Sequence, residues 1–124
     1  MTPEVRVSVP AAGGYLQVVR NVVAAIAARA GCSIDVLADL RLAVDEAATR
    51  LLHDVPDADA LVVEAQRAPD ELAVTVAVRG DGAWPSEGLD GSMGWQILTA
   101  LVEEARATRT GDGPAIAFRV SVGA

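Results

Sequence analysis

The chain has 124 residues, of which 52% are hydrophobic, so it is long enough for one domain with a substantial core. Aromatic residues make up only 3% and the formal net charge is -7, which argues against stacking on single-stranded nucleic acid and against a phosphate-backbone partner. The acidic balance suits a basic protein partner or simple solubility, and charge alone does not separate these two.

Residue usage excludes several kinds of chemistry. All ten basic residues are arginines, so there is no lysine for a Walker-type phosphate loop or a Schiff base. The single cysteine, Cys32, has no partner for a disulfide or a cysteine-based metal site, which is typical of a reducing cytosol. The single histidine, His53, excludes a histidine-rich metal cluster, and we predict no metal site.

The chain also lacks the patterns of membrane and export segments. No apolar run reaches the roughly 18 residues of a membrane span without a charge. Residues 1–10 lack the basic region and apolar run of a signal peptide. The sequence therefore predicts a cytoplasmic protein without a membrane partner.

The first half of the chain predicts one strand and two helices. Alternating valines over residues 5–9 indicate a half-buried strand. Apolar residues at helical spacing over 15–30 predict a helix that Gly31 ends, and Ser33 is a good N-cap for a second helix running to about His53. The expected buried stripe of this second helix consists of Leu37, Leu40, Ala43, Val44, Ala47 and Leu51.

The second half of the chain changes to strand-like alternation. Residues 61–65 and 72–78 predict an antiparallel hairpin, 95–104 a third helix, and 105–109 and 116–122 two further strands. This order most simply gives an α+β fold, a two-layer sandwich in which a mixed, mainly antiparallel sheet carries three helices on one face. We expect the whole chain, residues 1–124, to form a single domain.

A polar wall lies beside the buried stripe of the second helix and consists of Asp39, Glu46, Arg50 and His53. Glu46 and Arg50 are one helical turn apart on this wall, and a carboxylate beside a guanidinium suits a nucleotide site. They also fit an ordinary i to i+4 ion pair on a solvated face, worth only about 0.2–0.5 kcal/mol. Arg41 and Asp45 repeat the spacing on another stripe, which shows how readily such pairs arise.

A glycine-rich loop separates the hairpin from the third helix. It contains five of the 11 glycines of the chain, Gly80, Gly82, Gly88, Gly91 and Gly94. Such a loop can approach phosphates closely or move as a lid, and the free N–H groups of the following helix favour an anion. The alternative is a flexible surface loop.

Together, these segments resemble the RsbW-type anti-sigma regulatory factors, serine-protein kinases of the GHKL (Bergerat-fold) ATPase superfamily. Residues 40–52 look like the N box of that family, 76–84 like its first glycine box and 91–104 like its second. Members hold a sigma factor away from RNA polymerase, and many phosphorylate an anti-anti-sigma factor on a serine to stop it releasing the sigma factor. The resemblance spans nearly the whole chain and implies the same fold, the same two protein partners and a homodimer formed through the sheets and first strands.

The resemblance also assigns residues. Glu46 falls at the general-base glutamate of the family, and Arg20 falls at a helix-one arginine used in partner contact, with Gln17 and Asn21 beside it. The implied cofactor is ATP with Mg²⁺. The residues at the matching binding positions are Arg50, Gly80, Asp81, Gly82, Gly91 and Gly94.

The chain departs from the family pattern in both boxes. Arg50 replaces the N-box asparagine that holds Mg²⁺, and a guanidinium cannot ligate a metal, although it can contact a phosphate. Gly80 replaces the aspartate that accepts from the adenine amino group, with Asp81 one residue later, and Trp84 stands at a usual glycine. Arg50 and the Trp-x-x-Leu-Thr-Ala-Leu segment starting at Trp95 look similar to an actinobacterial branch of these factors.

Three functions follow from these features. The leading hypothesis is an anti-sigma factor that sequesters a sigma factor, is released by an anti-anti-sigma antagonist, and has a degenerate nucleotide site in which Glu46 is vestigial. The second is an active ATP-dependent serine kinase that phosphorylates the antagonist. The third is a scaffold or dimerisation domain without a sigma partner.

Overall fold

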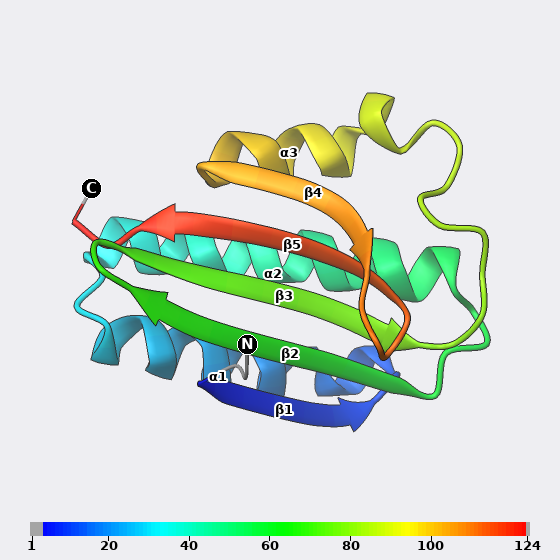
Figure 1. Cartoon of the computed structure of the whole chain (residues 1–124), viewed down its shortest axis with the longest axis horizontal. Helices are drawn as coiled ribbons and strands as arrows, with labels where there is room; N and C mark the ends of the chain where they lie inside the picture. Colours follow the sequence, from blue (N-terminus) through cyan, green and yellow to red (C-terminus); the bar gives the residue numbers. More distant parts are fainter. Residues whose placement is uncertain (1–3, 124) are drawn as a thin grey trace.

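The computed structural model describes residues 4–123, which form one sheet and three α-helices (Figure 1). The strands and helices, in chain order, are β1 (Val5–Pro10), α1 (Leu16–Arg29), α2 (Ile34–Asp54), β2 (Ala60–Ala68), β3 (Glu71–Arg79), α3 (Met93–Leu101), β4 (Glu104–Arg109) and β5 (Pro114–Ser121). The strand order is β1-β2-β3-β5-β4, and every described strand pair is antiparallel. The three helices cover one face of the sheet, which confirms the predicted two-layer α+β fold.

Short local signals set the ends of the helices. The Ser33 hydroxyl accepts a hydrogen bond from the N–H of Val36 at 3.2 Å at the start of α2, as its N-cap role predicts. α1 ends just before Gly31, whose φ of +87° lies in the left-handed region that favours glycine. Ser92 caps α3 in the same way, accepting from the N–H of Trp95 at 3.2 Å. None of the described helices combines the length and the apolar character needed to cross a bilayer.

The third helix is shorter than its apolar spacing predicts. α3 ends at Leu101, and Val102 is already extended, with φ -126° and ψ 164°. The N–H of Glu103 then bonds to the carbonyl oxygen of Arg119 at 2.9 Å. The expected helical end at residue 104 is therefore wrong, because pairing with β5 takes the chain into the sheet first.

One hydrophobic core fills the space between the sheet and the helices. Its largest fully buried side chains include Leu40, Leu51, Leu61, Leu72, Leu98 and Ile116. Five of the six residues in the predicted stripe of α2 are buried. Leu37 is only half-buried, and Val36 and Ala48 are buried in addition, so the buried face is broader than the predicted stripe.

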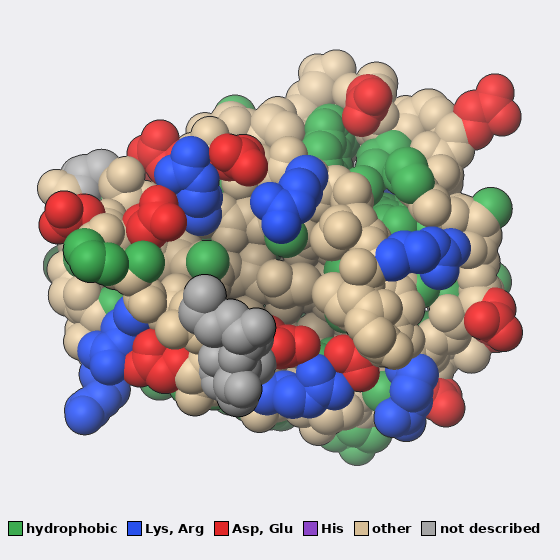
Figure 2. Space-filling model, in the orientation of Figure 1, with side chains coloured by type: hydrophobic (Ala, Val, Ile, Leu, Met, Phe, Trp, Pro, Cys, Tyr) green, Lys and Arg blue, Asp and Glu red, His purple; other side chains and the backbone are tan. Residues whose placement is uncertain are grey.

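The other face of the sheet is open and carries charged side chains of both signs (Figure 2). Arg6 on β1 pairs with Glu64 on β2 at 2.8 Å and with Asp112 in the β4–β5 turn at 2.7 Å. The hydrogen bonds and charge of Arg6 hold the pKa of Asp112 below its usual range, although partial burial acts in the opposite direction. These contacts tie the turn between β4 and β5 back to the edge strand β1.

We predict that Leu40→Ala lowers the free energy of unfolding by about 2–5 kcal/mol, because Leu40 is fully buried and its truncation leaves a cavity. Leu42→Ala is the matched control on the same helix. Leu42 is 53% exposed, so we expect its variant to stay within about 0.5 kcal/mol of the wild type. Urea unfolding followed by circular dichroism measures both, and equal losses would contradict the observed orientation of α2.

Candidate functional site

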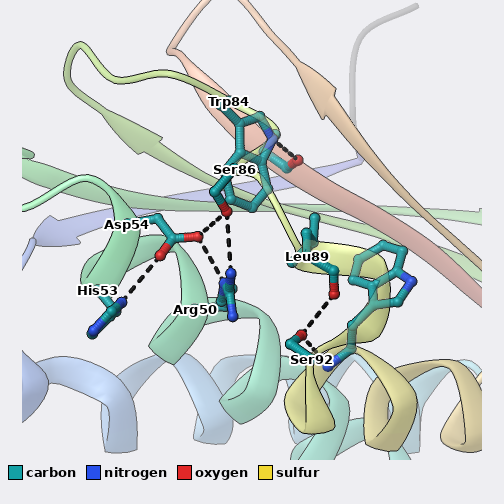
Figure 3. Close-up of polar contacts among 9 residues, drawn as sticks. Arg50, His53, Asp54, Trp84, Ser86, Leu89 and Ser92 are labelled. Carbon is teal, nitrogen blue, oxygen red and sulfur yellow. Dashed lines mark hydrogen bonds and ion pairs between the residues drawn. The ribbon is translucent and has the colours of Figure 1, made fainter.

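The segments singled out by the sequence meet around the C-terminal turns of α2 (Figure 3). The loop of residues 80–92 passes beside those turns and leads into α3. An open cavity of about 280 Å³ lies between α2 and α3 and is lined by Glu46, Thr49, Arg50, His53 and Gly94. Two of the residues predicted to bind the cofactor, Arg50 and Gly94, therefore share a wall with the predicted base Glu46.

Glu46 reaches this cavity from α2 and packs against α3. A Cβ added to Gly94 would lie 3.0 Å from Glu46 Oε2, so a glycine there lets the helix approach the carboxylate closely. Among the described residues, Arg50 forms its ion pair with Asp54, with 2.7 Å between Nε and Oδ2, and forms none with Glu46. The interpretation of Glu46 and Arg50 as an i to i+4 ion pair is therefore wrong, because Arg50 has better partners at the end of the helix.

Arg50 is part of a polar network that joins α2 to the loop (Figure 3). Its Nε donates to Asp54 Oδ2 at 2.7 Å, and its Nη2 donates to Ser86 Oγ at 3.2 Å. Ser86 Oγ in turn donates a short hydrogen bond to Asp54 Oδ2. His53 Nδ1 lies 3.0 Å from the other carboxylate oxygen, Oδ1. Both oxygens of Asp54 are thus engaged.

The network keeps Asp54 ionised. Only 9% of its side chain is exposed, and burial by itself raises the pKa of a carboxyl. The hydrogen bonds from Ser86, His53 and Arg50, with the charge of Arg50, outweigh that burial and leave the pKa of Asp54 below its usual range. The positive charge of Arg50 is therefore balanced by a carboxylate of its own helix.

Trp84 anchors the middle of the loop in the core. The residue is 8% exposed, packs within the main hydrophobic cluster, and its indole Nε1 donates to the carbonyl oxygen of Ala115 at 3.1 Å. Nearby, Arg109 Nη2 donates to the carbonyl oxygen of Gly82 at 2.6 Å. The alternative of a merely flexible surface loop therefore does not describe this part, which bonds to β4 and β5.

The glycines of the first box face the connection between α2 and β2. A Cβ added to Gly80 would lie 2.9 Å from the Cα of Ala58, and one added to Gly82 would lie 3.4 Å from the Val55 side chain. Asp81 is exposed and its N–H donates to Asp57 Oδ2 at 3.3 Å. Gly91, in the short 3-10 helix Leu89–Gly91, has open space around its Cα. Of these four predicted cofactor residues, none lines the cavity beside Glu46.

The three predicted partner residues lie on α1. Gln17 and Asn21 are exposed and bonded to each other at 2.9 Å. Arg20 Nη1 bonds to Asp45 Oδ2 on α2 at 3.2 Å, while its Nε is buried without a hydrogen-bond partner among the described residues. Asp45 thus pairs with Arg20 and not with Arg41, so the two helices are joined here by an ion pair.

Sequence reasoning missed Asp54 and Ser86 as candidate site residues. Asp54 carries a weak signal, because it lies four residues after Arg50 on the same helix. Ser86 lies 36 residues away from Arg50 in the chain, so only the folded structure brings it to the network. No group of three or more His, Cys, Asp or Glu side chains within residues 4–123 is placed to hold a metal ion.

We predict that Gly80→Ala destabilises the protein by about 1–3 kcal/mol, because its Cβ would meet the backbone of Ala58 at 2.9 Å. Gly91→Ala is the control, since a Cβ there meets nothing within 4 Å, and we expect a change below about 0.5 kcal/mol. Thermal unfolding followed by circular dichroism measures both variants. Equal effects would show that the close approach at Gly80 is not what requires glycine.

Residues 9–120 match the model of the histidine kinase-like ATPase domain, and the chain belongs to that family. Within it, the chain is similar to the anti-sigma-F factor RsbW of Mycobacterium tuberculosis, with 36% identity over 107 residues in each of two strains. The match covers 85% of this chain and 61% of the relative, so the chain spans less than two thirds of the relative's length. The predicted resemblance to RsbW-type members of the GHKL superfamily is confirmed.

Two solved structures share the fold. The RsbU and RsbW domains of a Mycobacterium tuberculosis protein align with a TM-score of 0.73 and 21% identity, over 98% of this chain and 33% of the other. The histidine kinase domain of a blue-light-activated kinase from Erythrobacter litoralis aligns with a TM-score of 0.57 and 22% identity, over 92% of this chain and 62% of the other. At these identities the likeness concerns the fold alone.

Proposed function

We propose that this chain is a non-catalytic anti-sigma factor, which sequesters a sigma factor and releases it when an anti-anti-sigma antagonist binds. The observation that carries the proposal is Arg50. It stands where the family pattern has a metal-holding asparagine, and its guanidinium bonds to Asp54 and Ser86. Because a guanidinium offers only hydrogen-bond donors, Arg50 cannot ligate Mg²⁺ at the position where the family pattern has its metal ligand.

The cavity beside Arg50 also favours a non-catalytic role. Of the predicted cofactor residues, only Arg50 and Gly94 line it. The first-box residues Gly80, Asp81 and Gly82 lie away from it, and Trp84 belongs to the core. A nucleotide therefore finds few of the contacts that the family pattern would give it.

The helical side of the molecule offers a surface for a protein partner. The large hydrophobic side chains that the structure describes as exposed all lie on or next to helices: Tyr15, Val18, Ile34, Leu42, Met93 and Ile97. A groove of about 430 Å³ on this side is lined by Arg20, Ile34, Leu37, Ala38, Arg41, Leu42 and Asp45. Exposed apolar residues rimmed by charges are typical of protein interfaces. We propose that the sigma factor and its antagonist compete for this surface.

Binding to candidate sigma factors tests the proposal. We expect one sigma factor of the native host to form a complex with the purified chain, and the antagonist to displace it. Arg20→Ala should weaken that complex by about tenfold or more, because a charged group in a partner groove is removed, whereas Arg29→Ala, at the far end of α1, should change it less than about twofold. Isothermal titration calorimetry measures each affinity.

A further control separates contact from helix packing. Asp45→Ala breaks the same ion pair between α1 and α2 but leaves the Arg20 guanidinium in place. If Arg20 acts by touching the partner, this variant binds more tightly than Arg20→Ala. The proposal fails if the chain binds none of the sigma factors of its host.

The alternative function is an active serine kinase. The observation that favours it is Glu46, whose carboxylate lines the cavity and has no ion pair or hydrogen bond among those of the described residues. Phosphoryl transfer depends mainly on positioning and on neutralising charge, so loss of the metal ligand should impair it severely.

Calorimetry with ATP and Mg²⁺ separates the two functions. We predict that ATP with Mg²⁺ shows no measurable binding to the wild type. Arg50→Asn, which restores the family residue, should bind ATP with Mg²⁺ measurably. Arg41→Asn, on the same helix but outside the cavity, should behave like the wild type. Micromolar binding by the wild type that Arg50→Asn does not improve would count against a degenerate site and in favour of the kinase.

The proposed function also bears on the predicted homodimer, cellular location and domain organisation. A homodimer is consistent with β1 lying at the edge of the sheet, where unpaired backbone groups need covering. We propose that the chain acts in the cytoplasm, where it would meet a sigma factor, and that residues 1–124 form a single domain.

A further inference from the structure

Successive contacts along the loop of residues 80–92 fix it to the rest of the fold. They join Asp81 to Asp57, Gly82 to Arg109, Trp84 to Ala115, and Ser86 to both Arg50 and Asp54. Leu89, further along, is buried with 3% exposure in the main core. A glycine-rich segment that is held at so many points is ordered by the protein itself.

The contact at Ser86 differs chemically from the others. Its hydroxyl accepts from Arg50 and donates to Asp54, while Arg50 also donates to Asp54, so three side chains bond to one another in a closed ring. Hydrogen bonds to ionised groups are about twice as strong as neutral ones, and the side chain of Asp54 is nearly buried. We call Arg50, Asp54 and Ser86 the latch.

We infer that the latch holds the loop of residues 80–92 against α2 through the protein's own side chains, so that the position of the loop does not depend on ATP. The cation that joins the loop to the helix is the guanidinium of Arg50, which belongs to the chain and does not dissociate. The inference deepens the proposed non-catalytic function, with which a loop placed without ATP accords, and it stands on the contacts of the latch.

Hydrogen-exchange mass spectrometry tests the latch. We expect backbone amides of residues 81–91 to exchange at least about tenfold faster in Ser86→Ala than in the wild type, because both hydrogen bonds of the hydroxyl are lost. Ser86→Thr, which keeps the hydroxyl, should retain most of the protection. Ser8→Ala, an exposed serine on β1, is the control for a serine truncation and should leave the loop unchanged.

Arg50→Asn and Arg41→Asn form a second matched pair on α2. Only Arg50→Asn should speed loop exchange, since no ion pair among the described residues uses Arg41. Amides of β3 and β5 serve as the internal reference for the fold in every variant. If a latch variant also loses protection in β3 and β5, its fold is disturbed and its loop exchange is not informative. The test then uses the wild type alone, whose loop amides are measured with and without excess Mg²⁺ and ATP.

The latch is overturned if wild-type loop amides exchange as fast as those of an unstructured peptide, if Ser86→Ala leaves them unchanged, or if Mg²⁺ and ATP slow them further. It is supported if the wild-type loop is protected equally with and without nucleotide. Failure of sigma-factor binding in calorimetry would overturn the proposed function and leave this exchange pattern intact, so the two failures are distinguishable.

Discussion

The burial of one face of α2 is the constraint on which the rest of the molecule depends. This helix of 21 residues packs against α1 and α3 and against β3 and β5 of the sheet. Its buried face includes three alanines, Ala43, Ala47 and Ala48, whose short side chains let neighbouring elements approach closely. Because α2 packs against elements on several sides, rotating it about its axis would break its contacts with all of them and expose its apolar side chains to water.

A fixed buried face also fixes what each flank of α2 presents. Asp45 and Glu46 are adjacent in the chain, yet Asp45 bonds to Arg20 on α1 while Glu46 packs against Gly94 on α3. Successive residues of a helix point about 100° apart, so one helix can serve a partner groove on one side and a cavity on the other. The two candidate sites therefore share a scaffold without sharing residues.

Much of the fold was predictable, because the spacing of apolar residues and the residues that begin or end a helix are local properties of a sequence. The alternation of valines around 74–78, the cap at Ser33 and the stop at Gly31 each act within a few residues, and the structure confirms them. The end of α3 was not predictable in this way. Val102 fits a helical stripe in the sequence, but the hydrogen bond of Glu103 to Arg119 comes from a strand that follows later in the chain.

In the candidate site, the sequence singled out residues but not the hydrogen bonds that they make. The sequence located Arg50 and the glycine loop, since both stand in recognisable segments. It offered Glu46 as the nearest partner of Arg50, whereas Asp54 lies the same distance away in the other direction along the helix. What decides between the two carboxylates is Ser86, which bonds to Arg50 and Asp54 together and arrives from the loop.

On the proposed function, a sequestering protein without phosphoryl transfer switches partners by competition alone. Two partners that share one surface exclude each other, and the fraction bound to each follows from its concentration relative to its Kd. On the inferred latch, Arg50, Asp54 and Ser86 order the loop of residues 80–92 themselves, so no nucleotide is needed to order it. The affinities then stay constant as nucleotide levels change, so the amount of active antagonist becomes the variable to which the switch responds.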